Sequence, residues 1–267
     1  MTKKLLGTFF ELGGCGVMEA LTRTGLDYVI IDTEHGYFSE ESTADYIRAA
    51  ENGGLLPYVR IGSVQRPYVL RMLDIGARGL IVPNITSLEQ VEELVRWAKF
   101  PPVGQRGYCP TRTTAWGADD WSKDALSYMS ECNRRASIFP QCETAEALEQ
   151  VEAIAAMEGV DGIFVGPCDL SIALGVPLEM DSPKLLSAID RVLEACQRYG
   201  KQSIIFAGTP EKAREMFRKG FDSVAYSLDA SMLISAVKAQ AEACRAETSL
   251  WCAPSEGQTV QKGRDPL

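Results

Sequence analysis

The chain has 267 residues, of which 46% are hydrophobic and 24% are charged. This composition is typical of a globular protein and excludes a disordered or collagen-like chain. The 36 acidic residues outnumber the 27 lysines and arginines, and the resulting net charge of −9 would repel nucleic acid. The sequence has no apolar run of roughly 18 residues and no signal-peptide pattern, so we expect a cytoplasmic protein without a membrane span.

The eight cysteines are consistent with this location. None of them forms a CxxC pair or a zinc-like spacing, and a chain of this length needs no disulfide staples. We therefore expect reduced thiols, most of them on small buried side chains.

One pattern repeats along the chain: a short apolar run, a polar turn and then apolar residues at helical spacing. Ser87, Thr144 and Thr209 each precede such a helical stretch as an N-cap residue. The apolar runs predict eight strands, at Leu5–Phe10, Tyr28–Asp32, Pro57–Ile61, Gly79–Pro83, Ser137–Cys142, Gly162–Gly166, Ser203–Ala207 and Ser223–Ser227.

Continuously apolar strands that alternate with helices predict a parallel sheet covered by helices. Eight such units are the number that closes a (β/α)8 TIM barrel, and a doubly wound open sheet is the alternative. No GxGxxG motif follows the first strand, which favours the barrel. We predict one barrel domain over residues 1–248 and a polar tail over 249–267, disordered or docked on a neighbouring subunit.

A long segment, Pro101–Arg135, separates the fourth predicted strand from the fifth. It contains two glycine- and threonine-rich stretches before a predicted helix over Asp119–Asn133. Because the loops that follow barrel strands carry the active site, we expect this segment to lie over the active face.

Polar residues at the ends of the strands indicate where the chemistry takes place. His35, the single histidine of the chain, follows the second strand, and histidine ordinarily titrates near neutral pH. We expect His35 to act as a general acid or base, and an exposed structural residue is the alternative. Arg60 lies in an apolar strand, where a guanidinium needs an anionic partner. That partner is a substrate oxygen or, alternatively, Asp32 or Glu34.

Glu143 and Asp169 lie at the ends of the neighbouring strands five and six, so their side chains can meet above the barrel. Two carboxylates at this place can hold a hard divalent cation, with substrate oxygens and water as the other ligands. The alternative is that each carboxylate caps the helix that follows it. Cys142 and Cys168 are not expected to join the ligands, because successive strand residues point to opposite faces.

Six segments occur in a specific order within residues 5–230: Asp27–Gly36, Val59–Ile61, Leu73–Pro83, Pro101–Gly107, Gln141–Glu143 and Gly159–Ser171. Together they resemble the HpcH/HpaI family of class II pyruvate aldolases. That family includes 4-hydroxy-2-oxoheptanedioate aldolase, 2-dehydro-3-deoxyglucarate aldolase and macrophomate synthase.

The resemblance implies a role for each site residue. Glu143 and Asp169 would hold a divalent cation, namely Mg, Mn or Co. His35 would act as the base, and Arg60 would bind the ketone oxygen. It also implies that Gln141 lines the site, that Asp32 and Asp74 orient the histidine, and that the backbone around Gly166, Cys168 and Asp169 receives the pyruvyl carboxylate. Members of the family are typically homohexamers that exchange C-terminal helices.

These expectations predict a metal-dependent carbon–carbon lyase that uses pyruvate as the enolate and an aldehyde as the second substrate. No lysine stands at a predicted strand end, so a Schiff base is not expected. Three alternatives remain: an oxaloacetate decarboxylase, an acyl-CoA lyase with the same metal and enolate site, and a non-catalytic barrel that binds 2-oxo acids. His35 argues against the last of these, because binding alone does not require it.

Overall fold

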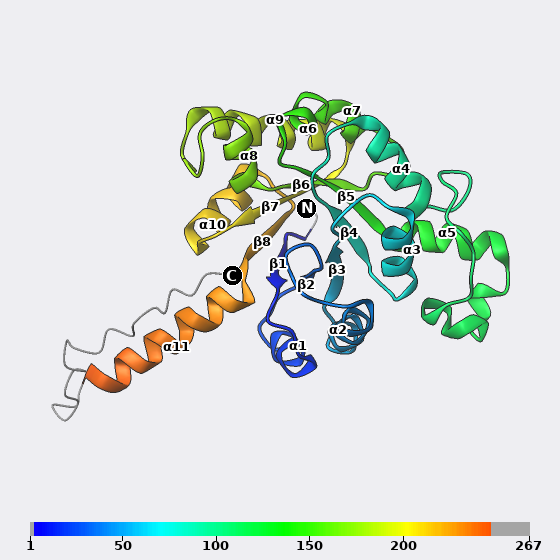
Figure 1. Cartoon of the computed structure of the whole chain (residues 1–267), viewed down its shortest axis with the longest axis horizontal. Coiled ribbons are helices and arrows are strands. Elements are labelled where there is room, and N and C mark those ends of the chain that lie inside the picture. Colours follow the sequence, from blue (N-terminus) through cyan, green and yellow to red (C-terminus); the bar gives the residue numbers. More distant parts are fainter. Residues whose placement is uncertain (1–2, 247–267) are drawn as a thin grey trace, which may run out of the picture. The chain divides into compact units, whose positions relative to one another are not determined.

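The computed structural model describes residues 3–246, and within them eight parallel strands form a closed barrel in chain order (Figure 1). The predicted (β/α)8 barrel is therefore confirmed. Each predicted strand is present, with both ends within one residue of the expected positions. The strands are β1 (Leu5–Phe10), β2 (Tyr28–Asp32), β3 (Leu56–Arg60), β4 (Gly79–Val82), β5 (Ser137–Cys142), β6 (Gly162–Val165), β7 (Gln202–Ala207) and β8 (Ser223–Leu228).

Helices follow the strands and begin at the predicted caps. The side chains of Ser87, Thr144 and Thr209 each accept a hydrogen bond from the backbone N–H three residues further on. The α-helices are α1 (Cys15–Leu21), α2 (Glu40–Asn52), α3 (Arg66–Asp74), α4 (Leu88–Ala98), α5 (Ala125–Arg135), α6 (Ala145–Glu149), α7 (Val151–Ala156), α8 (Pro167–Ala173), α9 (Pro183–Tyr199), α10 (Pro210–Lys219) and α11 (Asp229–Ala246). Two 3₁₀ helices, η1 (Arg112–Gly117) and η2 (Asp120–Ser122), precede α5.

The chain divides into two compact units, residues 1–229 and 230–267. The first unit contains the barrel, and the second contains α11 from Ala230 onward. The predicted polar tail over residues 249–267 lies outside the described residues. Among residues 3–246, no helix combines the length and the hydropathy that a membrane span requires.

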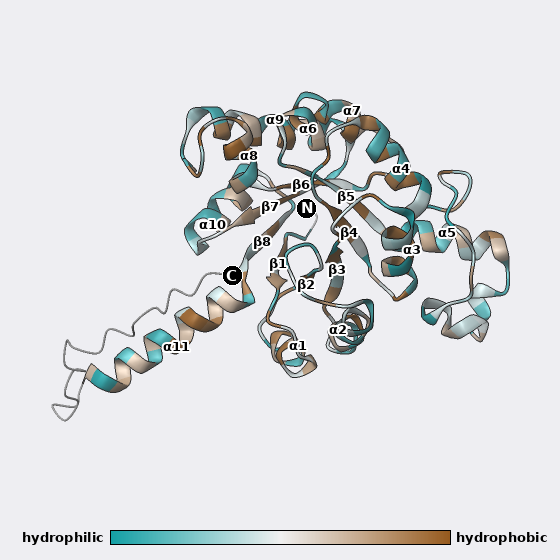
Figure 2. Cartoon of the chain, in the orientation of Figure 1, coloured by the Kyte–Doolittle hydropathy of each residue, from teal (hydrophilic) through white to brown (hydrophobic). Residues whose placement is uncertain are grey.

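Two layers of apolar side chains hold the barrel together, and Figure 2 shows hydrophobic colouring along its strands. The larger layer lies between the strands and the helices. Side chains that point inward form the smaller one, whose fully or nearly fully buried members are Phe9, Tyr28, Ile30, Tyr58, Ile81, Phe139, Phe164, Ile204 and Ala225. Residue 7 must be a glycine here, because a Cβ atom would lie 2.3 Å from the ring of Tyr28. These inward side chains fill the interior of the barrel.

The cysteines within residues 3–246 are all free thiols. The expectation that most of them are buried is wrong. Of the seven cysteines within residues 3–246, Cys132, Cys142 and Cys196 are buried, whereas three others are exposed. Burial raises the pKa of the Cys142 and Cys196 thiols to about 12, so both remain protonated at neutral pH.

The segment Pro101–Arg135 does not lie over the active face as predicted. We call the end of the barrel at which the strands finish the carboxyl end and the opposite end the amino end. The segment follows α4 rather than β4, and this helix returns the chain to the amino end. Two ion pairs place the segment there: Arg106 with Asp74 in the last turn of α3, at 2.7 Å, and Arg112 with Glu51 in the last turn of α2, at 2.6 Å.

Candidate active site

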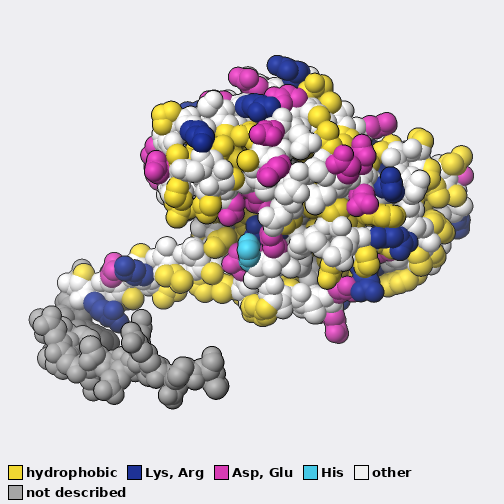
Figure 3. Space-filling view, turned by 45° about the horizontal axis from the view of Figure 1, so that its top comes forward, with side chains coloured by type: hydrophobic (Ala, Val, Ile, Leu, Met, Phe, Trp, Pro, Cys, Tyr) yellow, Lys and Arg dark blue, Asp and Glu magenta, His cyan; other side chains and the backbone are white. Residues whose placement is uncertain are grey.

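The carboxyl end of the barrel contains a cavity of about 190 Å³. Apolar side chains from β1, β6, β7 and β8 form part of its wall. In Figure 3 the single histidine lies at the surface beside acidic side chains. Many of the predicted site residues line this cavity, namely His35, Arg60, Gln141, Gly166, Cys168 and Asp169.

Arg60 is buried at the end of β3 and is held by two carboxylates. Its Nε and Nη2 atoms donate to the two oxygens of Asp32, at 2.9 and 2.5 Å. The second carboxylate is that of Glu34, whose Oε2 atom lies 3.3 Å from Nε of Arg60. Burial lowers the pKa of Arg60, but the hydrogen bonds and the charge of Asp32 outweigh it and raise the pKa above its usual value. The internal ion pair that was the alternative for Arg60 is present, and it leaves other guanidinium N–H groups for a ligand.

Asp32 also shapes the turn that carries His35. Its Oδ1 atom accepts hydrogen bonds from the backbone N–H groups of Glu34, at 3.0 Å, and His35, at 3.4 Å. The side chain of His35 is 70% exposed at the mouth of the cavity, with Nε2 4.0 Å from Oε2 of Glu34. Asp32 therefore acts on the histidine through the backbone of the turn.

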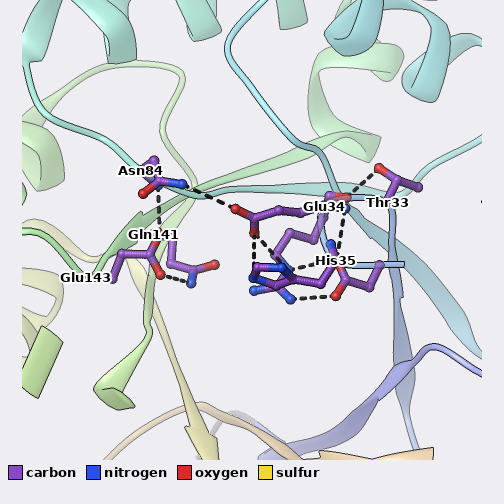
Figure 4. A network of polar contacts seen from close by, with 8 residues as sticks. Thr33, Glu34, His35, Asn84, Gln141 and Glu143 are labelled. Carbon is purple, nitrogen blue, oxygen red and sulfur yellow. Dashed lines mark hydrogen bonds and ion pairs between the residues drawn. The ribbon is translucent and has the colours of Figure 1, made fainter. Parts of the chain in front are cut away.

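Glu34 was not predicted as a site residue, yet it connects both sides of the cavity. Its Oε2 atom faces Arg60 and His35, and its Oε1 atom accepts a hydrogen bond from Nδ2 of Asn84 at 3.2 Å (Figure 4). Burial raises the pKa of Glu34 above its usual value, even though Arg60 lowers it. A residue of the β2 loop thus reaches the loop after β4.

Asn84 and Gln141 hold the carboxylate of Glu143, which is only 5% exposed. The backbone N–H of Asn84 donates to Oε1 of Glu143 at 2.7 Å, and Nε2 of Gln141 donates to Oε2 (Figure 4). Asn84 adopts a left-handed conformation with φ of 54°, which asparagine tolerates better than most residues. Burial raises the pKa of Glu143, and these two hydrogen bonds oppose the effect.

Asp169 is exposed in the first turn of α8, close enough to Glu143 for its charge to raise the pKa of that carboxyl. Neither carboxylate caps a helix, because Thr144 caps α6 and α8 has no side-chain cap. Gly166 precedes α8, and a Cβ atom there would lie 2.9 Å from Oε2 of Glu143. Glycine is therefore required here, because the side chains of Gln141 and Glu143 pack directly against its backbone.

Asp74 does not lie with the other predicted site residues. It is the last residue of α3, where the chain has returned to the amino end, and its carboxylate pairs with Arg106 at 2.7 Å. His35 follows β2 at the carboxyl end of the barrel. Within this chain the two residues are therefore at opposite ends of the strands.

The carboxyl end has an excess of negative charge that fits a cation. Asp169 and Arg60 line the cavity, and Asp32 and Glu34 pair with Arg60. The charge of Asp169 raises the pKa of Glu34 and of Glu143, so both glutamates lie near it. Within residues 3–246, no group of three or more histidine, cysteine or acidic side chains is placed to hold a metal ion. The hard oxygens of Glu143 and Asp169 suit a divalent cation that takes its remaining ligands from substrate and water.

The fold, the site and the comparisons with known proteins together define the class: this protein is a (β/α)8 carbon–carbon lyase. The family model "HpcH/HpaI aldolase/citrate lyase" matches residues 6–236, and the chain belongs to this family. The resemblance that the six sequence segments indicated is thereby confirmed.

Three similar proteins illustrate this membership. The chain is 34% identical to a hydroxypyruvate/pyruvate aldolase of Chromohalobacter salexigens, over 80% of this chain and 83% of the relative. It is 29% identical to a 2-keto-3-deoxy-L-rhamnonate aldolase of Klebsiella pneumoniae, over 87% and 85% of the two chains. The crystal structure of an HpcH/HpaI aldolase/citrate lyase family protein from Burkholderia cenocepacia has a TM-score of 0.84 and 33% identity, and the match covers 91% of this chain and 95% of that one.

Proposed function

We propose that this protein is a metal-dependent class II aldolase that uses pyruvate, or a close 2-oxo acid, as the enolate and an aldehyde as the acceptor. The observation that carries the proposal is a cavity lined by Asp169, Arg60 and His35, with two further carboxylates beside it. Glu34 faces Arg60 and His35, and Glu143 lies close enough to Asp169 for their charges to interact. The names of the two curated relatives contain a 2-keto acid and pyruvate, which supports a 2-oxo acid as the ligand.

Glu143 and Asp169 would hold the divalent cation, namely Mg, Mn or Co. When bound, such a cation supplies Lewis acidity that polarises the ketone of a 2-oxo acid. The hydrogen bonds from Asn84 and Gln141 fix both oxygens of Glu143 before any ligand arrives. Because both oxygens are already held in place, they need not reorganise during the reaction.

Arg60 stabilises negative charge on the ketone oxygen as the enolate forms. Asp32 and Glu34 fix the guanidinium, and its remaining N–H groups are available to a ligand in the cavity that Arg60 lines. Gly166, Cys168 and Asp169, which line the cavity at the start of α8, would receive the carboxylate of the 2-oxo acid on their backbone.

His35 moves the proton. In cleavage, Nε2 of His35 takes the proton of the C4 hydroxyl, the C3–C4 bond breaks, and its electron pair passes to the enolate while C4 becomes the aldehyde carbonyl. Proton transfer to C3 then gives pyruvate. The exposed position of His35 at the mouth suits this role, because the aldehyde leaves from that side.

The proposal includes a homo-oligomer in the cytoplasm, and the family resemblance suggests a hexamer. Light scattering at micromolar concentration tests it. A species of about 29.2 kDa, which is the mass of one chain, would contradict the oligomer.

A pyruvate-release assay with a panel of 4-hydroxy-2-oxo acids tests the reaction. We expect turnover of at least one of them, loss of turnover in EDTA, and recovery with Mg, Mn or Co. Turnover that EDTA leaves unchanged would contradict the metal. Binding of 2-oxo acids without any turnover, including that of oxaloacetate, would support the non-catalytic alternative.

A further inference from the structure

The amino end of the barrel contains a second cavity, of about 220 Å³, that the proposed reaction does not use. It lies between the ends of α2 and α3, the residues before β4 and β5, and the segment Pro101–Arg135. Glu51 is the one carboxylate in its described lining. Arginines dominate the wall, with side chains from Arg78, Arg106, Arg112 and Arg135.

Three of these arginines are fixed in place. Each has one carboxylate partner: Asp74 lies 2.7 Å from Arg106, Glu51 lies 2.6 Å from Arg112, and Glu131 lies 2.5 Å from Arg135. Aromatic rings support two of them. The guanidinium of Arg106 is 5.1 Å from the ring centre of Phe100, and that of Arg135 is 4.7 Å from that of Trp121. The cavity therefore presents ordered cationic groups.

Arg78 differs from the other three. No carboxylate within residues 3–246 pairs with it, and its Nε atom is buried without a hydrogen-bond acceptor. The Nε atom of Arg106, on a residue only 7% exposed, also has no acceptor among the described residues. An N–H group that is removed from water without an acceptor destabilises the folded chain. The arginines of this cavity thus have more donors than the protein satisfies.

We propose that this cavity binds a small anion with two or more charged oxygens, the chemistry that inorganic phosphate and short dicarboxylates share. Four guanidinium groups here face three carboxylate partners, which leaves one positive charge uncompensated in a chain of net charge −9. The planar fork of a guanidinium matches paired anionic oxygens. The volume is several times the roughly 30 Å³ that one water molecule takes up in the liquid, so a small anion fits.

Calorimetric titration of the full chain with phosphate, and separately with malonate, tests the site. We compare the wild type with Arg78→Gln, which loses the unpaired charge, and with Arg71→Gln. Arg71 is the matched control, because its side chain on α3 is 60% exposed and pairs with Glu40 outside the cavity. Arg78→Gln should weaken binding about tenfold or more, as expected for charge-assisted hydrogen bonds, and Arg71→Gln should change it less than about twofold.

Arg60 at the other end also attracts anions, so Arg60→Gln distinguishes the two cavities. Binding that Arg60→Gln abolishes and Arg78→Gln leaves unchanged would overturn the proposal, as would the absence of any binding by the wild type. Binding of phosphate but not malonate, or the reverse, identifies which anion the site prefers. If Arg78→Gln does not fold, Arg135→Gln removes a second lining charge and should also weaken binding; an unchanged affinity in that variant would overturn the proposal.

Discussion

The two ends of this barrel carry opposite charge on the same eight strands. At the carboxyl end, Arg60 and Asp169 line the cavity, and three further carboxylates, Asp32, Glu34 and Glu143, lie beside them. At the amino end, four arginines line the cavity, and three carboxylates pair with three of them. The two ends differ because different segments form them: the loops after the strands form the carboxyl end, and the loops after the helices form the amino end. The net charge of the chain therefore describes neither site.

Removing a negative charge from the carboxyl end tests the difference between the two ends most directly. Replacing Glu143 by Ala or Gln should lower turnover by roughly 10²–10³-fold or more, because the cation loses one of its two protein ligands. Steady-state kinetics and Mn²⁺ titration measure this loss. Glu146→Gln, the same change on the exposed surface of α6, is the control. Full activity of Glu143→Ala in metal-free buffer would refute the metal site, and anion binding at the amino end should be unaffected.

A second variant tests proton transfer at the acidic end. His35→Ala should depress aldol cleavage by roughly 10²–10⁴-fold, the range for a lost general base, and oxaloacetate decarboxylation less, because no C4 hydroxyl proton is removed there. Substrate binding should survive, since His35 lies at the rim. Equal loss of both activities would show that the role of His35 is not limited to the C4 hydroxyl proton. No loss of either would make His35 a structural residue.

Acidification should affect the two ends differently. Burial raises the pKa of Glu34, so the folded chain binds this proton more tightly than the unfolded chain. The charged form of Glu34 therefore costs stability at neutral pH, and this cost disappears as the pH falls through the raised pKa. Protonation also removes a carboxylate that holds Arg60, so turnover should fall up to about tenfold per pH unit below that pKa.

A pH–rate profile of Glu34→Gln checks this expectation, and the acid limb should flatten in the variant. An unchanged acid limb would assign it to another group. Sulfate stays charged across the range and guanidinium groups remain protonated, so sulfate binding at the amino end should not weaken on acidification.

The smallest effect is expected at Asn84. Asn84→Gly keeps the backbone N–H that binds Glu143 and tolerates φ of 54°, but it removes the side-chain bond to Glu34. Turnover should fall less than about tenfold, as for one hydrogen bond to a charged group. Asn84→Ala, the control, should be about 1 kcal/mol less stable than the glycine variant in urea unfolding, because alanine is strained there. A loss as large as that of Glu143→Gln would contradict a positioning role.

The fold could be predicted from the sequence because every strand is buried on both faces. Continuous apolar runs such as Tyr28–Asp32 then have clear ends, and eight of them close a barrel. The cavity residues His35, Arg60 and Asp169 were found for the same reason, since strand ends meet at one end of the barrel.

Sequence patterns did not predict two kinds of feature: the conformation of the loops, and the end of the barrel that a segment reaches. The roles of Glu34 and Asn84 follow from a left-handed residue and a turn, which leave no periodic signal. Asp74 was assigned by motif alone, and it ends a helix rather than a strand. The segment Pro101–Arg135 was placed at the wrong end because α4 returns the chain to the amino end before it begins.

The filled interior of the barrel determines how molecules enter and leave. Tyr28 and Tyr58 lie with ring centres 5.1 Å apart and are almost completely buried, so the core offers no passage between the ends. Substrates and products of the acidic cavity must share one opening. In the proposed reaction the aldehyde is formed at the rim beside His35, and the 2-oxo acid lies deeper, beside Glu143. Release should therefore be ordered, with the aldehyde first and pyruvate second, and pyruvate should inhibit cleavage competitively.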